Sequence, residues 1–216
     1  MSNVISLVDY GVGNLLSVRR ALEHCGAQVE LVTTPEQLAC AGKVLLPGVG
    51  AYANAMAILS EHGLADGLRD FSRTGNPLLG ICLGMQLLLD SSTEFGFVEG
   101  LGLIPGSVLP IPRKGVSGES VKVPNIGWRD LQPASGRDGW NDTLLHGTQR
   151  ENNAVYFVHS FMAVPDSDEH RVADCMYGGA PVAAVIENGN VWGAQFHPEK
   201  SGKVGLSMLQ TFVNLR

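Results

Sequence analysis

The stretch from Pro77 to Leu89 places the tightest limit on how this chain can fold. It begins as a short apolar run after a Gly-Asn-Pro turn, which is typical of a buried parallel strand. It continues as a run of strong helix formers, which predicts a helix over Leu83 to Asp90. The two are joined by Gly80-Ile-Cys-Leu-Gly84. A glycine two residues before and two residues after Cys82 lets the backbone turn sharply from strand to helix, as a nucleophile elbow requires.

Cys82 has two interpretations at this point. A thiol at such an elbow stands at the carboxyl edge of a sheet, where the start of a helix favours the thiolate. A lone cysteine in an apolar run is more often an inert part of the core. Because a cysteine nucleophile needs a base, and the base needs an orienting partner, the rest of the chain has to decide between them.

The remaining sequence predicts an α/β fold. Strands are expected at 4–8, 28–32 and 43–46, and helices at 15–25, 51–62 and 64–72. Strands that alternate with helices at this spacing indicate a parallel, doubly wound sheet. Further strands are expected at 100–112, 121–128, 154–161 and 171–177, followed by a hairpin of 182–187 and 190–196 and a final helix at 204–215. The sequence therefore predicts one domain over residues 1–216, with a mostly parallel sheet and an added antiparallel portion.

Composition excludes several classes of function. The net charge is −6 and the chain has no basic run, which argues against a nucleic-acid partner. No apolar run is long enough to span a membrane, and the first residues lack the charged region of a signal peptide. The four cysteines, Cys25, Cys40, Cys82 and Cys175, lack zinc-ligand spacing. We therefore expect no metal, no cofactor, no membrane contact and a cytoplasmic location with free thiols.

His197-Pro-Glu199 supplies the partners that a cysteine nucleophile needs. Residues two apart in an extended segment share a face, so Glu199 can orient the imidazole and stabilise its charge. We expect Pro198 to keep this segment extended. A single histidine is more often an ordinary surface or core residue, but together with Cys82 this pattern indicates nucleophilic catalysis.

Pro47-Gly-Val-Gly50 follows the third expected strand. A glycine-rich turn at a strand end can present main-chain N–H groups to an oxyanion, and the N–H of Leu83, the residue after the nucleophile, would be a second donor. For a Gly/Pro cluster considered by itself, an ordinary loop is the better interpretation.

These residues together carry a resemblance to a known family. Gly80 to Gln86, combined with His197 to Glu199, resembles the class I glutamine amidotransferases over nearly the whole chain. Residues 9–17, 47–50, 156–161 and 197–201 are similar to the glutaminase subunits of imidazole glycerol phosphate synthase, an enzyme of histidine biosynthesis. The resemblance implies a flavodoxin-like domain that hydrolyses L-glutamine through a thioester. It also implies that ammonia passes to a (β/α)8-barrel cyclase subunit in a heterodimer.

The resemblance also implies roles for individual residues. The triad would be Cys82 as nucleophile, His197 as acid and base, and Glu199 as its orienter. The oxyanion residues would be Gly50, Val49 and Leu83. Gln86, Glu94, His159, Ser160 and Phe161 would bind glutamine, with Glu94 at its α-amino group. Asn14, Asn125, Trp128 and Lys200 would lie at the partner interface.

Several alternatives stay open. His159 could be a satisfied core histidine, and Lys200 a solvated surface charge. Asn125 and Ile126 stand where the family usually has His and Met, which leaves open a paralogous glutaminase whose partner aminates sugars for surface polysaccharides. A free-standing cysteine hydrolase, or a binding module with an inactive site, would belong to other classes of protein.

Overall fold

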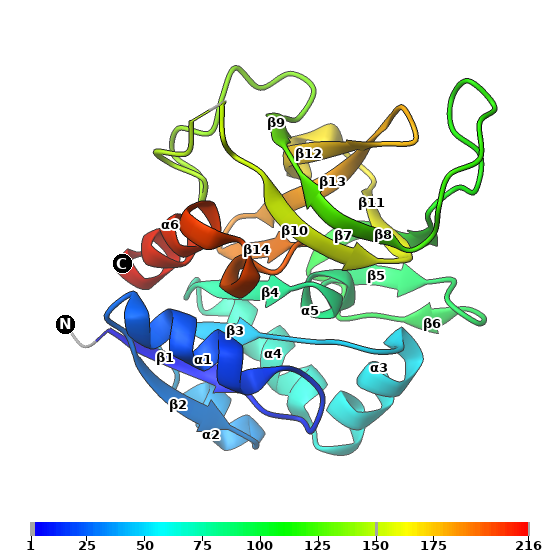
Figure 1. Cartoon of the computed structure of the whole chain (residues 1–216). Coiled ribbons are helices and arrows are strands. Elements are labelled where there is room, and N and C mark those ends of the chain that lie inside the picture. Colours follow the sequence, from blue (N-terminus) through cyan, green and yellow to red (C-terminus); the bar gives the residue numbers. More distant parts are fainter. Residues whose placement is uncertain (1–2, 150, 216) are drawn as a thin grey trace.

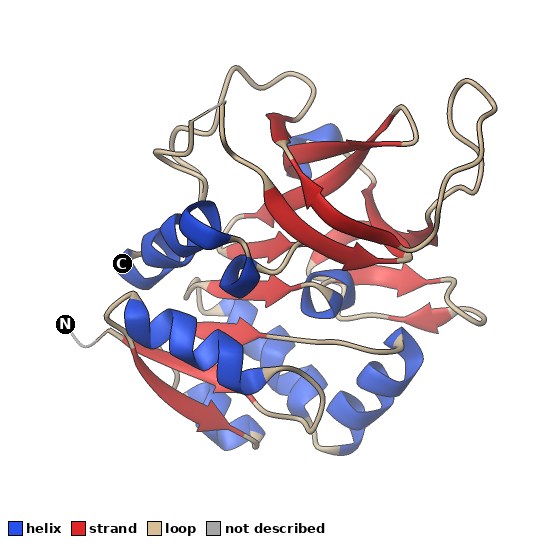
Figure 2. Cartoon of the chain, in the orientation of Figure 1, coloured by secondary structure: helices blue, strands red, loops and turns tan. Residues whose placement is uncertain are grey.

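The computed structural model describes residues 3–149 and 151–215. Within them, the largest sheet has eight strands in the order β2-β1-β3-β4-β14-β13-β12-β9 (Figures 1 and 2). Its strands are β1 (Val4–Val8), β2 (Gln28–Val32), β3 (Val44–Leu46), β4 (Leu78–Ile81), β9 (Leu131–Pro133), β12 (Arg171–Tyr177), β13 (Ala180–Asn188) and β14 (Val191–Ala194). From β2 to β14 the neighbours are parallel, and from β14 to β9 they are antiparallel. The parallel part has the flavodoxin-like order 2-1-3-4-5, so the expected fold class is confirmed.

Helices cover both faces of the parallel strands (Figure 1). They are α1 (Leu15–His24), α2 (Pro35–Ala39), α3 (Tyr52–Glu61), α4 (Leu64–Arg73), α5 (Leu83–Leu87) and α6 (Gly202–Asn214). Leu45 of β3 packs in one apolar cluster with α1 and α6. Its neighbours Val44 and Leu46 pack in a second cluster with α3 and α4. Because successive strand residues point to opposite faces and both faces are covered, β3 is apolar throughout, as is the neighbouring strand β4.

Two smaller sheets carry the rest of the second half. One has the order β11-β7-β5-β6, from β5 (Leu89–Ser92), β6 (Val98–Glu99), β7 (Ile104–Pro110) and β11 (Phe161–Pro165). The other pairs β8 (Asn125–Arg129) with β10 (Val155–His159). The single strand expected over 154–161 is therefore wrong. The chain bends at Ser160, because β10 pairs with β8 whereas β11 pairs with β7.

The expected helix over 83–90 is also too long, since α5 ends at Leu87. Main-chain N–H groups of Leu103 and Ile104 donate to the Leu88 carbonyl, at 2.8 and 3.0 Å, and Gly102 donates to Leu89 at 3.1 Å. These long-range hydrogen bonds engage the Leu88 and Leu89 carbonyls, which a longer helix would need for its own hydrogen bonds. The chain therefore continues as β5 instead.

Helix α2 was missing from the sequence-based prediction, although its start has a recognisable signal. Thr34 accepts a hydrogen bond from the Gln37 N–H while the Gln37 side chain accepts from the Thr34 N–H, which is a capping box, and Pro35 occupies the first turn.

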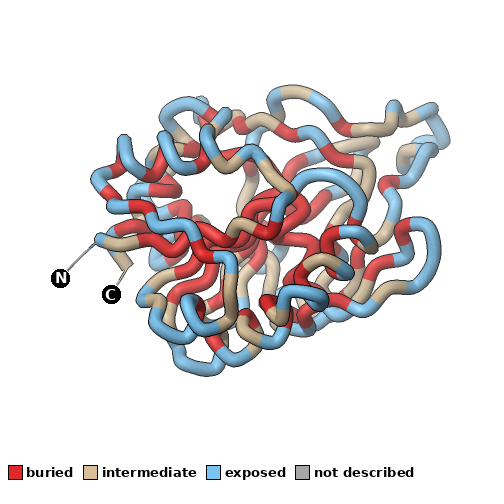
Figure 3. The backbone as a smooth tube through the Cα atoms, turned by 90° about the horizontal axis from the view of Figure 1, so that it is seen from below, coloured by how far each residue is buried: buried red, intermediate tan, exposed pale blue. Residues whose placement is uncertain are grey.

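The buried main chain lies at the centre of the molecule, with exposed segments around it (Figure 3). None of the helices in the described residues has the length and apolar character needed to cross a membrane.

Candidate active site

Three loops meet at the carboxyl ends of adjacent parallel strands. Residue 47 follows β3, Cys82 follows β4 and Gln195 follows β14, and β4 lies between the other two strands. The Cys82 N–H donates to the Ala194 carbonyl at 2.7 Å, so the ends of β4 and β14 are tied together. The elbow, the glycine-rich turn and the histidine segment of the sequence therefore share one edge of the sheet, where open α/β folds bind their ligands.

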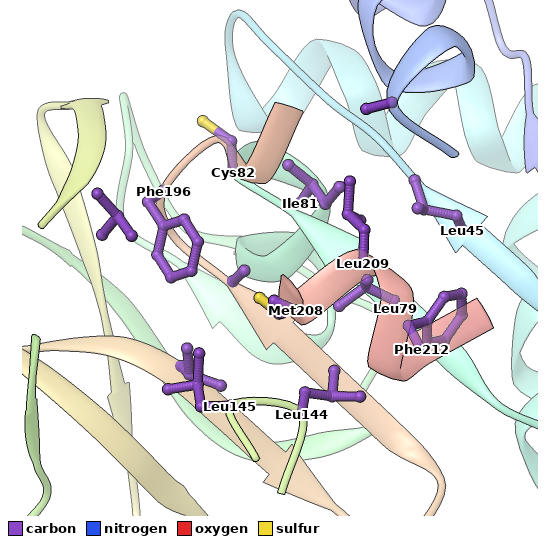
Figure 4. Packing of buried hydrophobic residues seen from close by; sticks show 14 of the residues in the cluster. Leu45, Leu79, Ile81, Cys82, Leu144, Leu145, Phe196, Met208, Leu209 and Phe212 are labelled. Carbon is purple, nitrogen blue, oxygen red and sulfur yellow. The ribbon is translucent and has the colours of Figure 1, made fainter. Parts of the chain in front are cut away.

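Cys82 has the strained backbone of a nucleophile elbow. Its φ and ψ are 56° and −111°, a combination that non-glycine residues rarely adopt. A Cβ atom on Gly80 would lie 2.5 Å from the Gly84 carbonyl oxygen, and one on Gly84 would lie 2.0 Å from the Leu46 carbonyl oxygen. Both glycines are thus required by close main-chain approach. Figure 4 shows Cys82 at the rim of the buried cluster, with its sulfur directed away from Ile81 and Leu209.

His197 and Glu199 form a buried ion pair. The distance from Nδ1 of His197 to Oε1 of Glu199 is 2.8 Å, and the two side chains are 5% and 1% exposed. The expectation that Pro198 keeps this segment extended is wrong, since residues Pro198–Lys200 form a single 3-10 turn. Proline is compatible with the first turn of a helix, and the turn brings the carboxylate back to the imidazole.

The surroundings of His197 favour its charged form. Burial alone would lower the pKa of the imidazole, but hydrogen bonds with Cys82 and Glu199, together with their negative charges, raise it to about 9. Because Nδ1 faces Glu199, Nε2 is the ring nitrogen left for Cys82. This arrangement can hold a proton taken from a thiol and later return it.

One of the expected oxyanion donors, the Leu83 N–H, is not free in this conformation. The Leu83 N–H donates to the Gly48 carbonyl oxygen at 3.3 Å, so a carbonyl occupies the place where an oxyanion would bind. Gly50 has a φ of 96°, in the region that glycine adopts without strain, and Val49 is 40% exposed. The glycine-rich turn therefore lies against the start of α5, and its Gly48–Val49 peptide directs the Gly48 carbonyl, not the Val49 N–H, at the Leu83 N–H.

Three of the residues expected to bind glutamine, Gln86, His159 and Phe161, share one polar network. Gln86 donates from Nε2 to the Phe161 carbonyl at 3.0 Å and to Oε1 of Gln195 at 2.9 Å. His159 contacts the same Phe161 carbonyl through Nδ1 at 2.8 Å. With both N–H groups of Gln86 engaged, the group it can offer a ligand is its carbonyl oxygen.

His159 is neutral in this network. Burial, together with a smaller effect of the nearby His197, lowers its pKa to about 4, although the hydrogen bond with the Phe161 carbonyl acts in the opposite direction. Since Nδ1 must donate to that carbonyl, Nε2 accepts, and Nδ2 of Asn125 lies 3.0 Å from it. The surface position expected for Asn125 is therefore wrong: the residue is fully buried and cannot reach a partner from this position.

The other expected residues are divided between the site and the surface. Glu94 is 9% exposed, and its Oε2 accepts from the Tyr52 N–H at 2.7 Å, just after the Pro47–Gly50 segment. Ser160 is half-buried at the bend before β11. Asn14, Trp128 and Lys200 are exposed, Asn14 as the N-cap of α1.

Sequence reasoning missed two side chains at this site. Gln195 is fully buried beside Gln86, and Tyr10 is 2% exposed with its hydroxyl on the Pro47 carbonyl at 2.9 Å. Each stands at the end of a predicted strand, which is the signal that could have identified it.

Within residues 3–149 and 151–215, no group of three or more His, Cys, Asp or Glu side chains is arranged to hold a metal ion.

Comparison with known proteins agrees with this geometry. The family model described as glutamine amidotransferase class-I matches residues 6–215. The chain belongs to the class I glutamine amidotransferases. A relative named imidazole glycerol phosphate synthase subunit HisH 1, from Legionella pneumophila (strain Lens), is 49% identical over 211 residues, covering 98% of this chain and 99% of its own. This amidotransferase is also 47% identical to a HisH subunit from Geobacillus thermodenitrificans, over 98% and 96% of the two chains.

Two further matches extend this comparison. A chloroplastic imidazole glycerol phosphate synthase hisHF from Arabidopsis thaliana is 43% identical, and the match covers 98% of this amidotransferase but 34% of the plant protein. Among solved structures, PurLQS from Thermotoga maritima superimposes with a TM-score of 0.72 at 23% identity, covering 99% of each chain. At that identity the likeness shows the common fold alone.

Proposed function

We propose that this amidotransferase is the glutaminase subunit of an imidazole glycerol phosphate synthase, with Cys82, His197 and Glu199 as its catalytic triad. The observation that carries the proposal is the arrangement at the ends of β4 and β14. A strained cysteine elbow contacts an imidazole whose other nitrogen lies 2.8 Å from a buried carboxylate. The Legionella and Geobacillus relatives support the assignment to this synthase.

The first half of the reaction forms a thioester. Cys82 gives its proton to Nε2 of His197, and the thiolate attacks the side-chain carbonyl carbon of L-glutamine. The carbonyl electrons move to oxygen, which gives a tetrahedral oxyanion. When the C–N bond breaks, the imidazolium donates its proton to the leaving nitrogen, and ammonia departs from a γ-glutamyl thioester. Glu199 keeps the ring oriented and stabilises its charge throughout.

The second half restores the enzyme. His197 accepts a proton from water while the water oxygen attacks the thioester carbonyl. The C–S bond then breaks, the new carboxyl group releases its proton to solvent as glutamate leaves, and the thiolate of Cys82 faces the imidazolium again. No cofactor is needed, because each step moves one proton between sulfur, imidazole and the substrate.

Full activity requires a change at the Gly48–Val49 peptide. Turning this peptide over would release the Leu83 N–H from the Gly48 carbonyl and direct the Val49 N–H at the oxyanion. Donors of this kind contribute about 3–4 kcal/mol each, which corresponds to 10²–10³-fold in rate. We therefore infer that the isolated subunit hydrolyses glutamine slowly, and that binding of the partner and its ligand favours the turned peptide.

Two side chains suit the two ends of glutamine. The carbonyl oxygen of Gln86 suits the amide N–H groups of glutamine. The carboxylate of Glu94, which accepts from the Tyr52 N–H, suits its α-ammonium group. Main-chain groups of the segment from His159 through Ser160 to Phe161 would bind the amino-acid end.

A second chain would consume the ammonia. Free ammonium is not a nucleophile, so ammonia has to travel through a closed path to its acceptor. In the Arabidopsis relative the matched region is 34% of a longer chain. The Legionella and Geobacillus relatives are each named as a subunit of the synthase. These names support the proposal that this amidotransferase works with a separate (β/α)8-barrel cyclase in a heterodimer in the cytoplasm.

The outer face of the β8–β10 ribbon is our candidate for the docking surface. Ile126 is paired with Val158 and Trp128 with Tyr156, so these residues share a face. Ile126, Trp128 and Val158 are 50%, 52% and 37% exposed, and the Trp128 and Tyr156 rings pack edge to face. Exposed aromatic and apolar side chains are typical of the centre of an interface. Asn14 and Lys200 are exposed as well and remain candidates at its rim.

The test measures glutamate released from glutamine by the purified chain, alone and with the cyclase subunit and its formimino-nucleotide substrate. We expect slow hydrolysis alone, a large stimulation in the complex, and no activity in Cys82→Ala under either condition. Full-speed hydrolysis without the partner would contradict the inferred control. Activity that depends on Cys82 but ignores this cyclase would point to another partner, such as a sugar-aminating synthase. Hydrolysis of peptides instead of glutamine would point to a free-standing cysteine hydrolase.

A further inference from the structure

Tyr10 connects the turn after β1 with the glycine-rich segment after β3. It is 2% exposed, and its hydroxyl donates to the Pro47 carbonyl oxygen at 2.9 Å. Burial and the neighbouring charge of Cys82 both raise the pKa of this hydroxyl. Tyr10 therefore stays protonated throughout the neutral range, and its proton remains available to the Pro47 carbonyl.

The same hydroxyl forms one wall around Gly48. A Cβ atom on residue 48 would lie 2.8 Å from the Tyr10 hydroxyl oxygen, 2.9 Å from the Gly84 nitrogen and 3.0 Å from Cβ of Leu83. Gly48 is thus enclosed between Tyr10 on one side and the start of α5 on the other. Its own carbonyl oxygen is the one that accepts from the Leu83 N–H.

We propose that Tyr10 is a positioning residue for glutamine hydrolysis: it anchors the Pro47–Gly48 peptide, so that the following Gly48–Val49 peptide can turn about a fixed point and present its N–H to the oxyanion. This inference rests on the proposed function. Because a peptide group is planar, the Gly48–Val49 peptide can turn over by rotation about ψ of Gly48 and φ of Val49 alone. The Pro47–Gly48 peptide then keeps its position. The hydrogen bond of Tyr10 would accordingly persist in both positions of the Gly48–Val49 peptide.

The anchor matters because the donor has to be placed accurately. An oxyanion donor acts at about 2.7–3.1 Å from the oxygen, and a misplacement of 1 Å in an active site costs on the order of 100-fold in rate. The position of the Val49 N–H depends on the Cα of Gly48, which the Tyr10 hydrogen bond holds through the Pro47 carbonyl. Removing the hydroxyl lets that carbon move by a fraction of this distance, so we expect a loss of about tenfold.

The experiment uses Tyr10→Phe in the complex with the cyclase subunit and its nucleotide. We expect kcat for glutamine hydrolysis to fall about tenfold with KM changed less than twofold, since the oxyanion contact that Tyr10 positions is made in the transition state and not with bound glutamine. Replacement of Tyr10 by p-aminophenylalanine, which restores a donor, should recover most of kcat. The matched control is Tyr177→Phe, whose hydroxyl also donates to a main-chain carbonyl, that of Lys122, and which should keep the wild-type kcat.

A second measurement distinguishes an effect on the Gly48–Val49 peptide from an effect on the reactivity of Cys82. The rate at which iodoacetamide alkylates Cys82 depends on the thiolate and needs no oxyanion donor, so Tyr10→Phe should match the wild type. All assays run well below the melting temperature of each variant, which keeps a less stable variant folded. A kcat within twofold of wild type in Tyr10→Phe would overturn the inference, as would an equal loss in the alkylation rate. If the proposed function itself were wrong, the result would be different: the wild-type complex would show no glutamine hydrolysis that is lost in Cys82→Ala.

Discussion

The ion pair between His197 and Glu199 allows a quantitative prediction for the variant Glu199→Gln. The imidazole Nδ1 lies 2.8 Å from the carboxylate, and the pKa of His197 is raised to about 9 by Cys82 and Glu199 against the opposing effect of burial. Glutamine keeps the size of the side chain and an acceptor oxygen but removes the charge. The variant therefore isolates the electrostatic part of the interaction.

The expected magnitude follows from the two kinds of hydrogen bond. One made to a charged group contributes about 1.5–3 kcal/mol and one between neutral groups about 1 kcal/mol. The difference of about 0.5–2 kcal/mol corresponds to about 0.4–1.5 pKa units. We therefore expect the pKa of His197 to fall from about 9 to roughly 7.5–8.5 in Glu199→Gln. Because the imidazolium loses its proton as the pH rises through its pKa, the charged form would then be lost at a lower pH.

The assay is an NMR titration of 13Cε1-labelled histidine, with the His197 signal assigned by its absence in His197→Asn. Cys82 and His197 titrate as a coupled pair, so the upper apparent pKa of the pair is the quantity compared. Glu23→Gln, at an exposed ion pair on α1, is the control and should leave the upper pKa unchanged. An upper pKa that moves by less than about 0.3 of a unit in Glu199→Gln would refute the electrostatic account of the pair.

Three further predictions concern stability and docking. Gly84→Ala places a Cβ 2.0 Å from the Leu46 carbonyl oxygen, so we expect a loss of about 3 kcal/mol or more in urea denaturation. His159 has a pKa of about 4 in the folded chain, below its unfolded value, so the free energy of unfolding should fall by up to about 3 kcal/mol between pH 6.5 and 4. His159→Gln should lack this slope, and an unchanged slope would contradict the assignment. Trp128→Ala should weaken cyclase binding at least tenfold in calorimetry, whereas unchanged affinity would exclude the ribbon as a docking surface.

The predictable parts of the fold were those with local signals. The parallel strands are short apolar runs between turn residues, and the boundaries expected for β1 and β2 match the structure. The length of α5 could not be predicted, because the bonds from Leu103 and Ile104 that end it come from residues distant in the chain. The strand break at Ser160 has the same origin, since the two halves pair with different strands.

The candidate site shows the same division. The elbow around Cys82 was visible in the sequence because Gly80 and Gly84 are a local requirement of its backbone. The burial of Asn125 was not visible, because its position depends on the pairing of β8 with β10, which sets it opposite His159. Residues 125 and 159 are adjacent only through this pairing.

By itself, the sequence indicated the amidotransferase chemistry and the alternation of strands and helices in the first half of the chain. Residue types, glycine spacing and hydrophobic period are properties of neighbouring residues. They can therefore be recognised in the sequence without any knowledge of distant contacts. The tertiary structure alone decided that β4 lies between β3 and β14, which brings Cys82 to His197 across more than a hundred residues. It also decided that the Leu83 N–H donates its hydrogen bond to the Gly48 carbonyl. Such contacts depend on strand order and on the orientation of single peptides, for which no local pattern exists.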